Sequence, residues 1–231
     1  MLILALETAT DHSSAALLAD DRPRAEWRAE ASHDLCRLLA AELRAMFAKA
    51  GARFDTLDLI AVGLGPGSFT ALRIGLATAK GIALAHGLPL VGVSSLAAMA
   101  WQMRGHLPGL LCPVLDARRG DLYAAIYRPL PDRIEPVEPE FVAKPAQIAD
   151  KLRRQQEPVT VLGQLAPEQA DDLRAAASIH PDPVFPDALA IAQLGRRRFL
   201  TSGADDLPSL RPVYIRMSYA EEHFDIDLGL R

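Results

Sequence analysis

Apolar residues in the first half of the chain form short runs between polar turns, followed by one longer segment with helical spacing. Short apolar runs are typical of buried strands, and apolar residues that recur every three or four positions are typical of an amphipathic helix. The pattern predicts three strands and then a helix, namely Leu2–Leu6, Ser13–Leu18, Arg24–Ala29 and His33–Ala50. Gly51 is expected to end this helix, because glycine adopts the left-handed conformation of a helix C-terminus without strain.

The next segment contains two apolar runs joined by a glycine-rich loop and a long helix. Leu57–Leu64 is short enough to be a buried strand, and the breaking sequence GLGPG follows it. A helix is predicted over Thr70–His86, with Ser68 or the first threonine as its cap and Gly87 at its end. Leu90–Val93 is predicted to be the next strand. Strand, helix and strand form a βαβ unit, whose crossover should be right-handed.

The second half is predicted to repeat this order of elements without repeating the sequence. The expected strands are Leu111–Asp116, Leu122–Arg128, Pro136–Val142 and Pro158–Leu162. The expected helices are Lys144–Gln155, Pro167–Ala177 and Pro186–Ser202. Gly105 and Pro108 interrupt the pattern near the middle of the chain. We therefore expect an α/β protein with one half at 1–104 and another at 105–216, a last helix that can pack back on the first half, and an acidic tail at 217–231.

The composition indicates in which compartment the protein works and whether it binds nucleic acid by itself. The 231 residues are 50% hydrophobic and 23% charged, with a formal net charge of −4, so no basic excess points to unaided nucleic-acid binding. Cys36 and Cys112 lie in apolar runs and are expected to be reduced core residues. No signal peptide precedes Leu2, and the long helix is too short and too charged to span a bilayer. We expect a cytoplasmic protein that does not insert into membranes.

The glycine loop leaves two interpretations open. Backbone N–H groups at the start of a helix attract anions, so Gly65, Gly67 and Ser68 are weak candidates for contact with phosphate. The loop, however, has neither the lysine of a Walker A motif nor the last glycine of GxGxxG. A tight structural turn explains the same residues.

Four segments resemble the landmarks of the TsaB (YeaZ) family. GLGPGSFTALRIGLATAKGIA is similar to its signature, in which GPGSFTGxR precedes a helix of small residues. LILALETATDHSSAAL, LDARRGDLYAAIY and PVYIR are similar to its other landmarks, so the resemblance extends over residues 1–216. Ala71 stands where the family pattern has glycine, a difference that bears on close packing.

The resemblance implies two tandem halves of the ribonuclease H-like or actin-like ATPase (ASKHA) fold, each a mixed sheet flanked by helices. Actin-like ATPases hold the metal of Mg-ATP with a carboxylate near the end of the first strand of each half. Glu7 and Asp116 occupy these positions, and carboxylates suit Mg²⁺. They are weak candidates for a nucleotide site, because acidic residues at strand ends also cap turns.

The resemblance also implies a subunit without catalytic residues of its own. Catalytic relatives, the TsaD proteins, carry an HxxxH metal motif after the strand that follows the helix corresponding to Thr70–His86. Here Ser95 and Met99 stand at those two positions. Serine is a weak ligand and a thioether is a poor one for hard cations, so no metal is expected in the isolated chain.

The implied function is a scaffolding and activating subunit for the threonylcarbamoylation of adenosine 37 in tRNA. Its expected partners are a TsaD-like catalytic subunit and a TsaE-like ATPase, which would hold the metal and ATP. The tRNA would bind only through the complex, and the chain alone could form a homodimer. Two alternatives are a stand-alone actin-like ATPase and a peptidase of the glycoprotease group.

The predicted helix Thr70–His86, which we call the central helix, carries more apolar and small residues than one sheet can cover. Together with helix His33–Ala50, it is implied by the resemblance to be the pairing surface. Because small residues spaced four apart let another helix approach closely, we expect Ala79 at the contact. The predicted interface residues are Leu38, Arg73, Gly75, Ala79 and Lys80.

Overall fold

The computed structural model describes residues 1–30 and 34–216 and divides into two compact units. Unit 1 comprises Met1–Ala98 and Pro186–Pro212, and unit 2 comprises Met99–Phe185 and the described residues 213–216. The division lies inside helix α3 (Ser95–Met103) and not at the predicted 104/105, because α3 contributes residues to both units. The acidic tail predicted at 217–231 lies outside the described residues.

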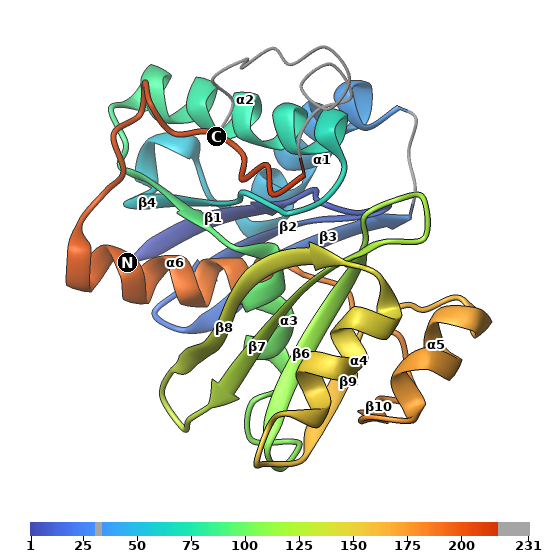
Figure 1. The fold of residues 1–231 in the computed structure, drawn as a ribbon. Coiled ribbons are helices and arrows are strands. Elements are labelled where there is room, and N and C mark those ends of the chain that lie inside the picture. The colour runs from blue at the N-terminus through green and yellow to red at the C-terminus, as the bar shows by residue number, and fades with distance from the viewer. Residues whose placement is uncertain (31–33, 217–231) are drawn as a thin grey trace. The chain divides into compact units, whose positions relative to one another are not determined.

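Unit 1 is built on a five-stranded mixed sheet with the strand order β3-β2-β1-β4-β5 (Figure 1). β1 pairs antiparallel with β2 and parallel with β4, which pairs parallel with β5. In this register Leu4 lies opposite Ile60, and Ile60 lies opposite Leu90. The strands are Leu2–Glu7 (β1), His12–Ala19 (β2), Arg22–Glu30 (β3), Leu59–Gly63 (β4) and Leu90–Val93 (β5).

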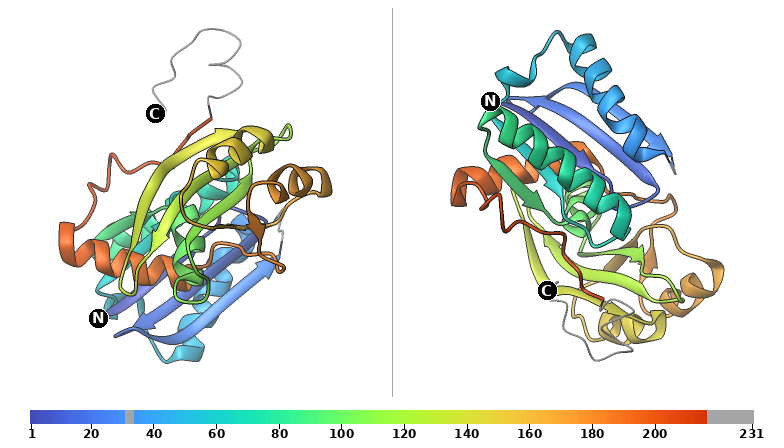
Figure 2. Two further views of the ribbon diagram at one scale, coloured as in Figure 1. Left: turned by 60° about the horizontal axis from the view of Figure 1, so that its bottom comes forward. Right: turned by 90° about the horizontal axis from the view of Figure 1, so that it is seen from above.

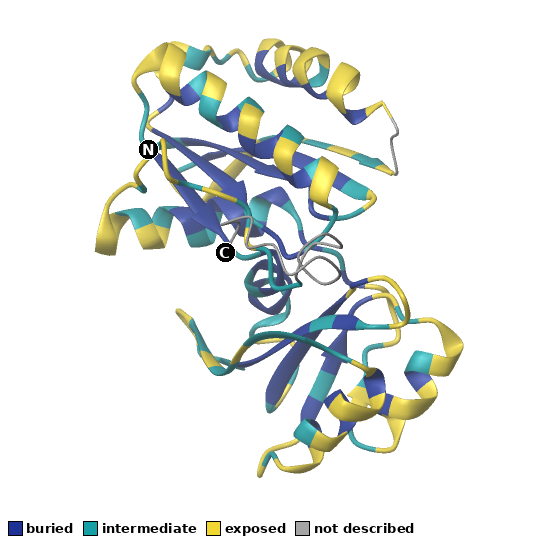
Figure 3. Ribbon diagram, turned by 45° about the horizontal axis from the view of Figure 1, so that its top comes forward, coloured by how far each residue is buried: buried dark blue, intermediate teal, exposed yellow. Residues whose placement is uncertain are grey.

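Helices cover both faces of this sheet (Figures 1 and 2). α1 (Leu35–Ala50) and α2 (Phe69–His86) pack on one face, and α6 (Ala188–Ser202) packs on the other against β1, β2 and β4. The apolar core beneath α1 and α2 includes Leu4 and Leu39, which are almost completely buried. Figure 3 shows the buried strands between helices whose outer surfaces are exposed.

Unit 2 contains a second five-stranded sheet, ordered β10-β9-β6-β7-β8. Read from β8 to β10 this is the order of unit 1, with an antiparallel meander followed by two parallel strands. α4 and α5 cover an apolar core on this sheet. The elements are Leu110–Asp116 (β6), Leu122–Pro129 (β7), Ile134–Ala143 (β8), Pro145–Arg153 (α4), Val159–Leu162 (β9), Pro167–Arg174 (α5) and Ser178–Ile179 (β10).

The two tandem α/β halves predicted from the sequence are confirmed. Sequence reasoning missed η1 (Phe54–Thr56) and β10, because neither is long enough to leave an apolar run. Cys112 is buried as predicted, but the core position predicted for Cys36 is wrong, since it lies exposed beside the buried Leu35. Within the described ranges, no helix combines the length and the apolar character needed to cross a membrane.

The helix ends of unit 1 follow from local chemistry, with the start of α2 as an exception. Gly51 and Gly87 end α1 and α2 with φ of 60° and 64°, as glycine permits. The Ser94 hydroxyl accepts a hydrogen bond from the N–H of Ala97 (3.0 Å) at the start of α3. Ser68 is at the N-cap of α2, but its side chain makes no capping hydrogen bond to the described residues.

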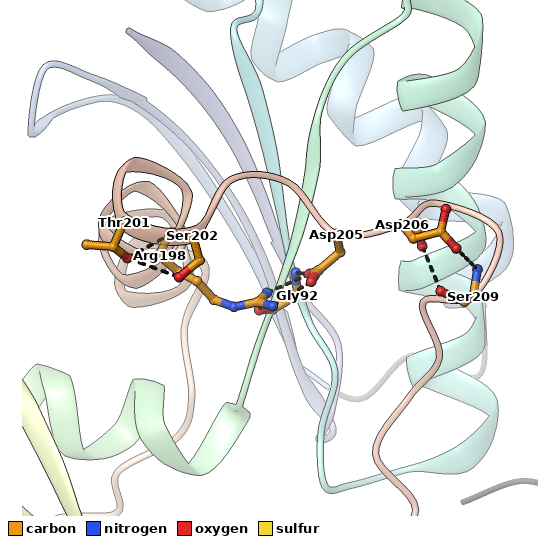
Figure 4. Close-up of polar contacts among 7 residues, drawn as sticks. All are labelled: Gly92, Arg198, Thr201, Ser202, Asp205, Asp206 and Ser209. Atoms are coloured by element: carbon orange, nitrogen blue, oxygen red, sulfur yellow. Dashed lines mark hydrogen bonds and ion pairs between the residues drawn. The ribbon is translucent and has the colours of Figure 1, made fainter.

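After α6 the chain crosses β5 and reaches α2, fixed by polar contacts (Figure 4). Asp205 accepts a hydrogen bond from the N–H of Gly92, and Arg198 donates one to the carbonyl of Gly92, both at 2.8 Å. Arg198 also pairs with Asp205, and its hydrogen bonds lower the pKa of that carboxyl. Lys80 Nζ then donates to the carbonyl of Pro208 (3.3 Å). These contacts cover a strand edge that could otherwise pair with another chain.

Replacing Asp205 by alanine should destabilise unit 1 by about 1–3 kcal/mol, because the Gly92 N–H and the Arg198 guanidinium each lose a partner. Asp206→Ala is the matched control, since Asp206 bonds only the nearby Ser209 with its side chain among the described residues. It should cost less than about 1 kcal/mol. Urea unfolding measures both. Equal losses would show that the Asp205 cluster adds no particular stability.

Candidate functional site

The glycine loop joins β4 to α2 and is held on both sides by backbone hydrogen bonds. The N–H of Leu64 donates to the carbonyl of Val93 (2.8 Å), and the N–H of Ser95 donates to the carbonyl of Gly65 (2.8 Å). The N–H of Ser68, at the start of α2, donates to the carbonyl of Ala9 (2.7 Å). The amide of Ser68, the N-cap residue of α2, therefore binds a carbonyl of the chain itself.

Two of the loop glycines are required by this packing. Gly65 has a φ of 91°, a conformation that side chains oppose, and its peptide bond to Pro66 is cis. Gly67 approaches Ala9 so closely that a Cβ would overlap the Ala9 carbonyl. The geometry of the loop is that of a tight turn packed on the β1–β2 connection, which is the structural interpretation of the sequence.

The carboxylate of Glu7 is completely buried at the end of β1. Oε1 accepts a hydrogen bond from the N–H of Ala9 (2.6 Å), and Oε2 accepts one from the Ser95 hydroxyl (2.8 Å). The carboxylate also fills the space beside Gly63 where a Cβ would otherwise lie. Loss of hydration on burial raises the pKa of Glu7 from 4.5 to about 7, although these hydrogen bonds oppose the shift.

The two residues that the family resemblance led us to compare with metal ligands lie inside the protein. Ser95 and Met99 are both completely buried. The Ser95 hydroxyl is used by Glu7, and the Met99 side chain is part of the core. Across the described residues, no group of three or more His, Cys, Asp or Glu side chains is placed to hold a metal ion.

Asp116 belongs to unit 2, where it ends β6 and binds the turn that follows. Oδ1 accepts a hydrogen bond from the N–H of Arg118 (2.8 Å), and Oδ2 forms an ion pair with the Arg118 guanidinium (3.5 Å). The carboxylate is about half exposed. These contacts are those of a turn-capping residue.

The outward face of α2 is mostly apolar or small. Leu84 is 76% exposed and Phe69 is 46% exposed, with the Arg73 guanidinium 3.8 Å from the centre of the Phe69 ring. A surface helix normally shows a broad polar face to water, whereas Arg73 is the one exposed charged residue on this side of α2 and the half-buried Lys80 lies beside it on the helical wheel. Its exposed members are Phe69, Thr70, Arg73, Ala77, Gly81, Leu84 and Ala85, which we call the α2 face.

Three of the residues predicted for a partner surface are accessible to different degrees. Arg73 is exposed on the α2 face, and Leu38 is 39% exposed on α1. Lys80 lies at the margin of the α2 face, half-buried, and its ammonium group binds the carbonyl of Pro208. Phe69 and Leu84 escaped the prediction, although they lie at helical spacing from Arg73 and so share its side of the helix.

The placement of Gly75 and Ala79 on a partner surface is wrong. Ala79 is completely buried in the core beneath α2. Gly75 packs so closely on Thr8 that a Cβ would overlap the Thr8 side chain, whose hydroxyl donates to the carbonyl of Ala71 (2.8 Å). The small residues spaced four apart let α2 approach its own sheet, and not a second subunit.

Known proteins match both the sequence and the fold. The family model "TsaD: tRNA N6-adenosine threonylcarbamoyltransferase" matches residues 29–182. The tRNA threonylcarbamoyladenosine biosynthesis protein TsaB of Bacillus subtilis (strain 168) is 30% identical over 233 residues, 96% of each chain. A crystal structure from Pseudomonas aeruginosa, described as similar to peptidase YEAZ, has a TM-score of 0.83 at 24% identity and covers 93% of this chain and 99% of its own.

A more distant structural neighbour sets the fold class. The ROK hexokinase of Thermus thermophilus has a TM-score of 0.50 at 11% identity, over 87% of this chain and 100% of its own. The fold is therefore of the actin-like α/β class, as predicted. The chain belongs to the TsaB (YeaZ) family.

Replacing Glu7 by glutamine should remove one pH-dependent contribution to stability. The pKa of Glu7 is about 7 in the folded chain, against 4.5 for an exposed glutamate, so the folded state binds more protons than the unfolded state between these values. Wild-type stability therefore falls by up to about 3 kcal/mol as the pH rises through this window. The variant cannot titrate there, so its stability relative to wild type should increase with pH.

Urea unfolding at intervals from about pH 5 to about pH 8 measures this difference, and contributions from other ionisable groups cancel between the two proteins. A difference that does not change with pH would show that Glu7 is already ionised in the folded chain at acidic pH.

Ala79→Glu should prevent stable folding, because it places an unpaired charge in the core at a cost of several kcal/mol. The control is Ala77→Glu, the same change at an exposed position of the same helix. It should keep a native melting transition by circular dichroism. A folded Ala79→Glu variant with an unchanged melting temperature would contradict the burial of this position.

Proposed function

We propose that this chain is a non-catalytic subunit in the biosynthesis of threonylcarbamoyladenosine in tRNA. In this proposal it pairs through the α2 face with a TsaD-like catalytic subunit and holds that subunit in an active arrangement. The observation that carries the proposal is the apolar α2 face, on which Leu84 and Phe69 remain exposed in the isolated chain. Exposed apolar residues gathered on one face mark interaction sites.

The relatives support the pathway. The B. subtilis relative that covers 96% of this chain is named as a tRNA threonylcarbamoyladenosine biosynthesis protein, and the matching family model describes a threonylcarbamoyltransferase. A chain with the fold of a transferase and a formal charge of −4 is suited to assist an enzyme more than to bind tRNA by itself.

Burial of Ser95 and Met99 supports a role without catalysis. The site where a relative would bind metal is occupied by a serine–glutamate hydrogen bond and an apolar side chain. In the proposed complex, metal and ATP are held by the TsaD-like subunit and by a TsaE-like ATPase, and tRNA binds through the assembly. When no partner is present, the same apolar face can pair two copies of this chain.

In the proposed interface, burial of the exposed Leu84 side chain would contribute a measurable part of the binding free energy. Burying a leucine side chain contributes about 1.5–3 kcal/mol, which corresponds to about 10- to 150-fold in affinity. The Arg73 guanidinium stacked on Phe69 adds a cation to an otherwise neutral face. Arginine is enriched among the hot spots of protein interfaces.

Leu84→Glu should leave the fold intact and weaken pairing with the TsaD-like subunit by about 100-fold or more, because an apolar contact is lost and a charge is stranded in the complex. The matched control is Leu200→Glu, the same change at a leucine that is 60% exposed on α6. Size-exclusion chromatography and calorimetric titration of the purified chains measure association, and circular dichroism checks folding.

Leu200→Glu should pair like wild type. Normal pairing by a folded Leu84→Glu variant would contradict the α2 face as the interface. Equal weakening by both variants would show that added negative charge alone reduces association.

A further inference from the structure

One of the two glycines of α2 is not explained by the packing of unit 1. Gly75 lies so close to Thr8 that a Cβ would overlap the Thr8 side chain. Gly81, in contrast, is exposed, and a Cβ added to it would meet no atom of the described residues within 4 Å. Its backbone is also outside the left-handed region that Gly51 and Gly87 adopt at the ends of α1 and α2. The described part of the chain therefore gives no reason for a glycine at this position.

A glycine inside a helix is unfavourable for folding. It loses more conformational freedom than alanine does when the helix forms. Gly81 lies well inside Phe69–His86, and Gly87 already ends the helix, so Gly81 is not needed as a cap. Glycine is also the residue that lets another main chain approach a backbone most closely. Because no described atom makes that approach to Gly81, we look for it in a partner.

Gly81 lies within the exposed apolar part of the helix. Leu84, one turn further along, is 76% exposed, and Ala77, one turn earlier, is also exposed. The neighbouring charged side chain is bound elsewhere, since Lys80 Nζ donates to the carbonyl of Pro208 (3.3 Å) in the segment after α6. The helix backbone at Gly81 is therefore accessible beside a large apolar side chain.

We infer that Gly81 is the position of closest approach between α2 and the TsaD-like subunit, whose main chain packs on the helix backbone there. Such a contact fixes the register of the two subunits, because only a position without a Cβ accepts it. The inference rests on the proposed function, which takes the TsaD-like subunit as the partner of the α2 face. The B. subtilis relative and the transferase family model support this choice of partner.

The test is Gly81→Ala, which should change stability and pairing in opposite directions. In the isolated chain the new methyl group meets no described atom and alanine favours the helix, so the melting temperature should rise by about 1–4 °C. In the complex the same methyl group overlaps the partner, so the affinity should fall by about 5-fold or more. Circular dichroism of the dilute chain measures the first effect, and calorimetric titration with the purified TsaD-like subunit measures the second.

Gly81→Leu makes the test more stringent. Leucine is a good helix former, and an added apolar side chain strengthens an apolar contact that has room for it. If the partner main chain lies against Gly81, this variant should stay folded and pair about 100-fold more weakly or worse. The matched control is Thr201→Leu, which places leucine at an exposed position of α6 and should pair like wild type.

Three results would overturn the inference. Pairing of wild-type strength or tighter by the Gly81 variants would show that the partner leaves room for a side chain. A lower melting temperature of the isolated Gly81→Ala chain would show that this glycine is packed within the chain. Equal weakening by Thr201→Leu would show that added apolar surface on any helix reduces association.

Failure of this inference can be told apart from failure of the proposed function. The inference fails alone if wild type pairs with the TsaD-like subunit and both Gly81 variants pair equally well. The proposed function fails if the wild-type chain does not associate with that subunit, and the inference then fails with it. The titration of wild type, made before any variant is measured, separates these two results.

Discussion

A carboxylate enclosed in an apolar core needs hydrogen-bond donors from its own chain, and the glycine loop of unit 1 is arranged around one. The Glu7 carboxylate accepts a hydrogen bond from the N–H of Ala9 on one oxygen and from the Ser95 hydroxyl on the other. Its bulk requires a glycine at position 63. This one group joins the end of β1, the end of β4 and the start of α3, and the loop between them is bonded to the carbonyl of Ala9.

This arrangement decides which surfaces remain for function. Amides and carbonyls of the glycine loop bond to the neighbouring backbone, and the Ser95 hydroxyl bonds to Glu7, so these residues pack unit 1 together. α2 is drawn onto the sheet by its small residues, with Gly75 against Thr8. Its opposite side, which contains Leu84, is left to water in the isolated chain. An apolar face on a closely packed helix is suited to a partner subunit.

Most strands and helices of the fold could be predicted from the sequence. Apolar runs, helical spacing and the glycines that end helices are all properties of residues close together in the chain. The side of α2 that faces the sheet could not be predicted. Small residues spaced four apart permit close approach by either a sheet or a helix, and only the packing of the folded unit shows that Ala79 lies in the core beneath α2. The contacts that Arg216 makes with the β6–β7 turn could not be predicted either, because Arg216 lies far along the chain from its partner Asp121.

The central claim is that the α2 face meets a TsaD-like subunit. The most direct measurement is methyl NMR of the leucine-labelled chain titrated with the unlabelled catalytic subunit, with Leu84 on α2 and Leu200 on α6 as paired reporters, both exposed in the free protein. The account predicts that the Leu84 methyl signals shift or broaden on binding while those of Leu200 stay unchanged. Perturbation of Leu200 with Leu84 unaffected would contradict it.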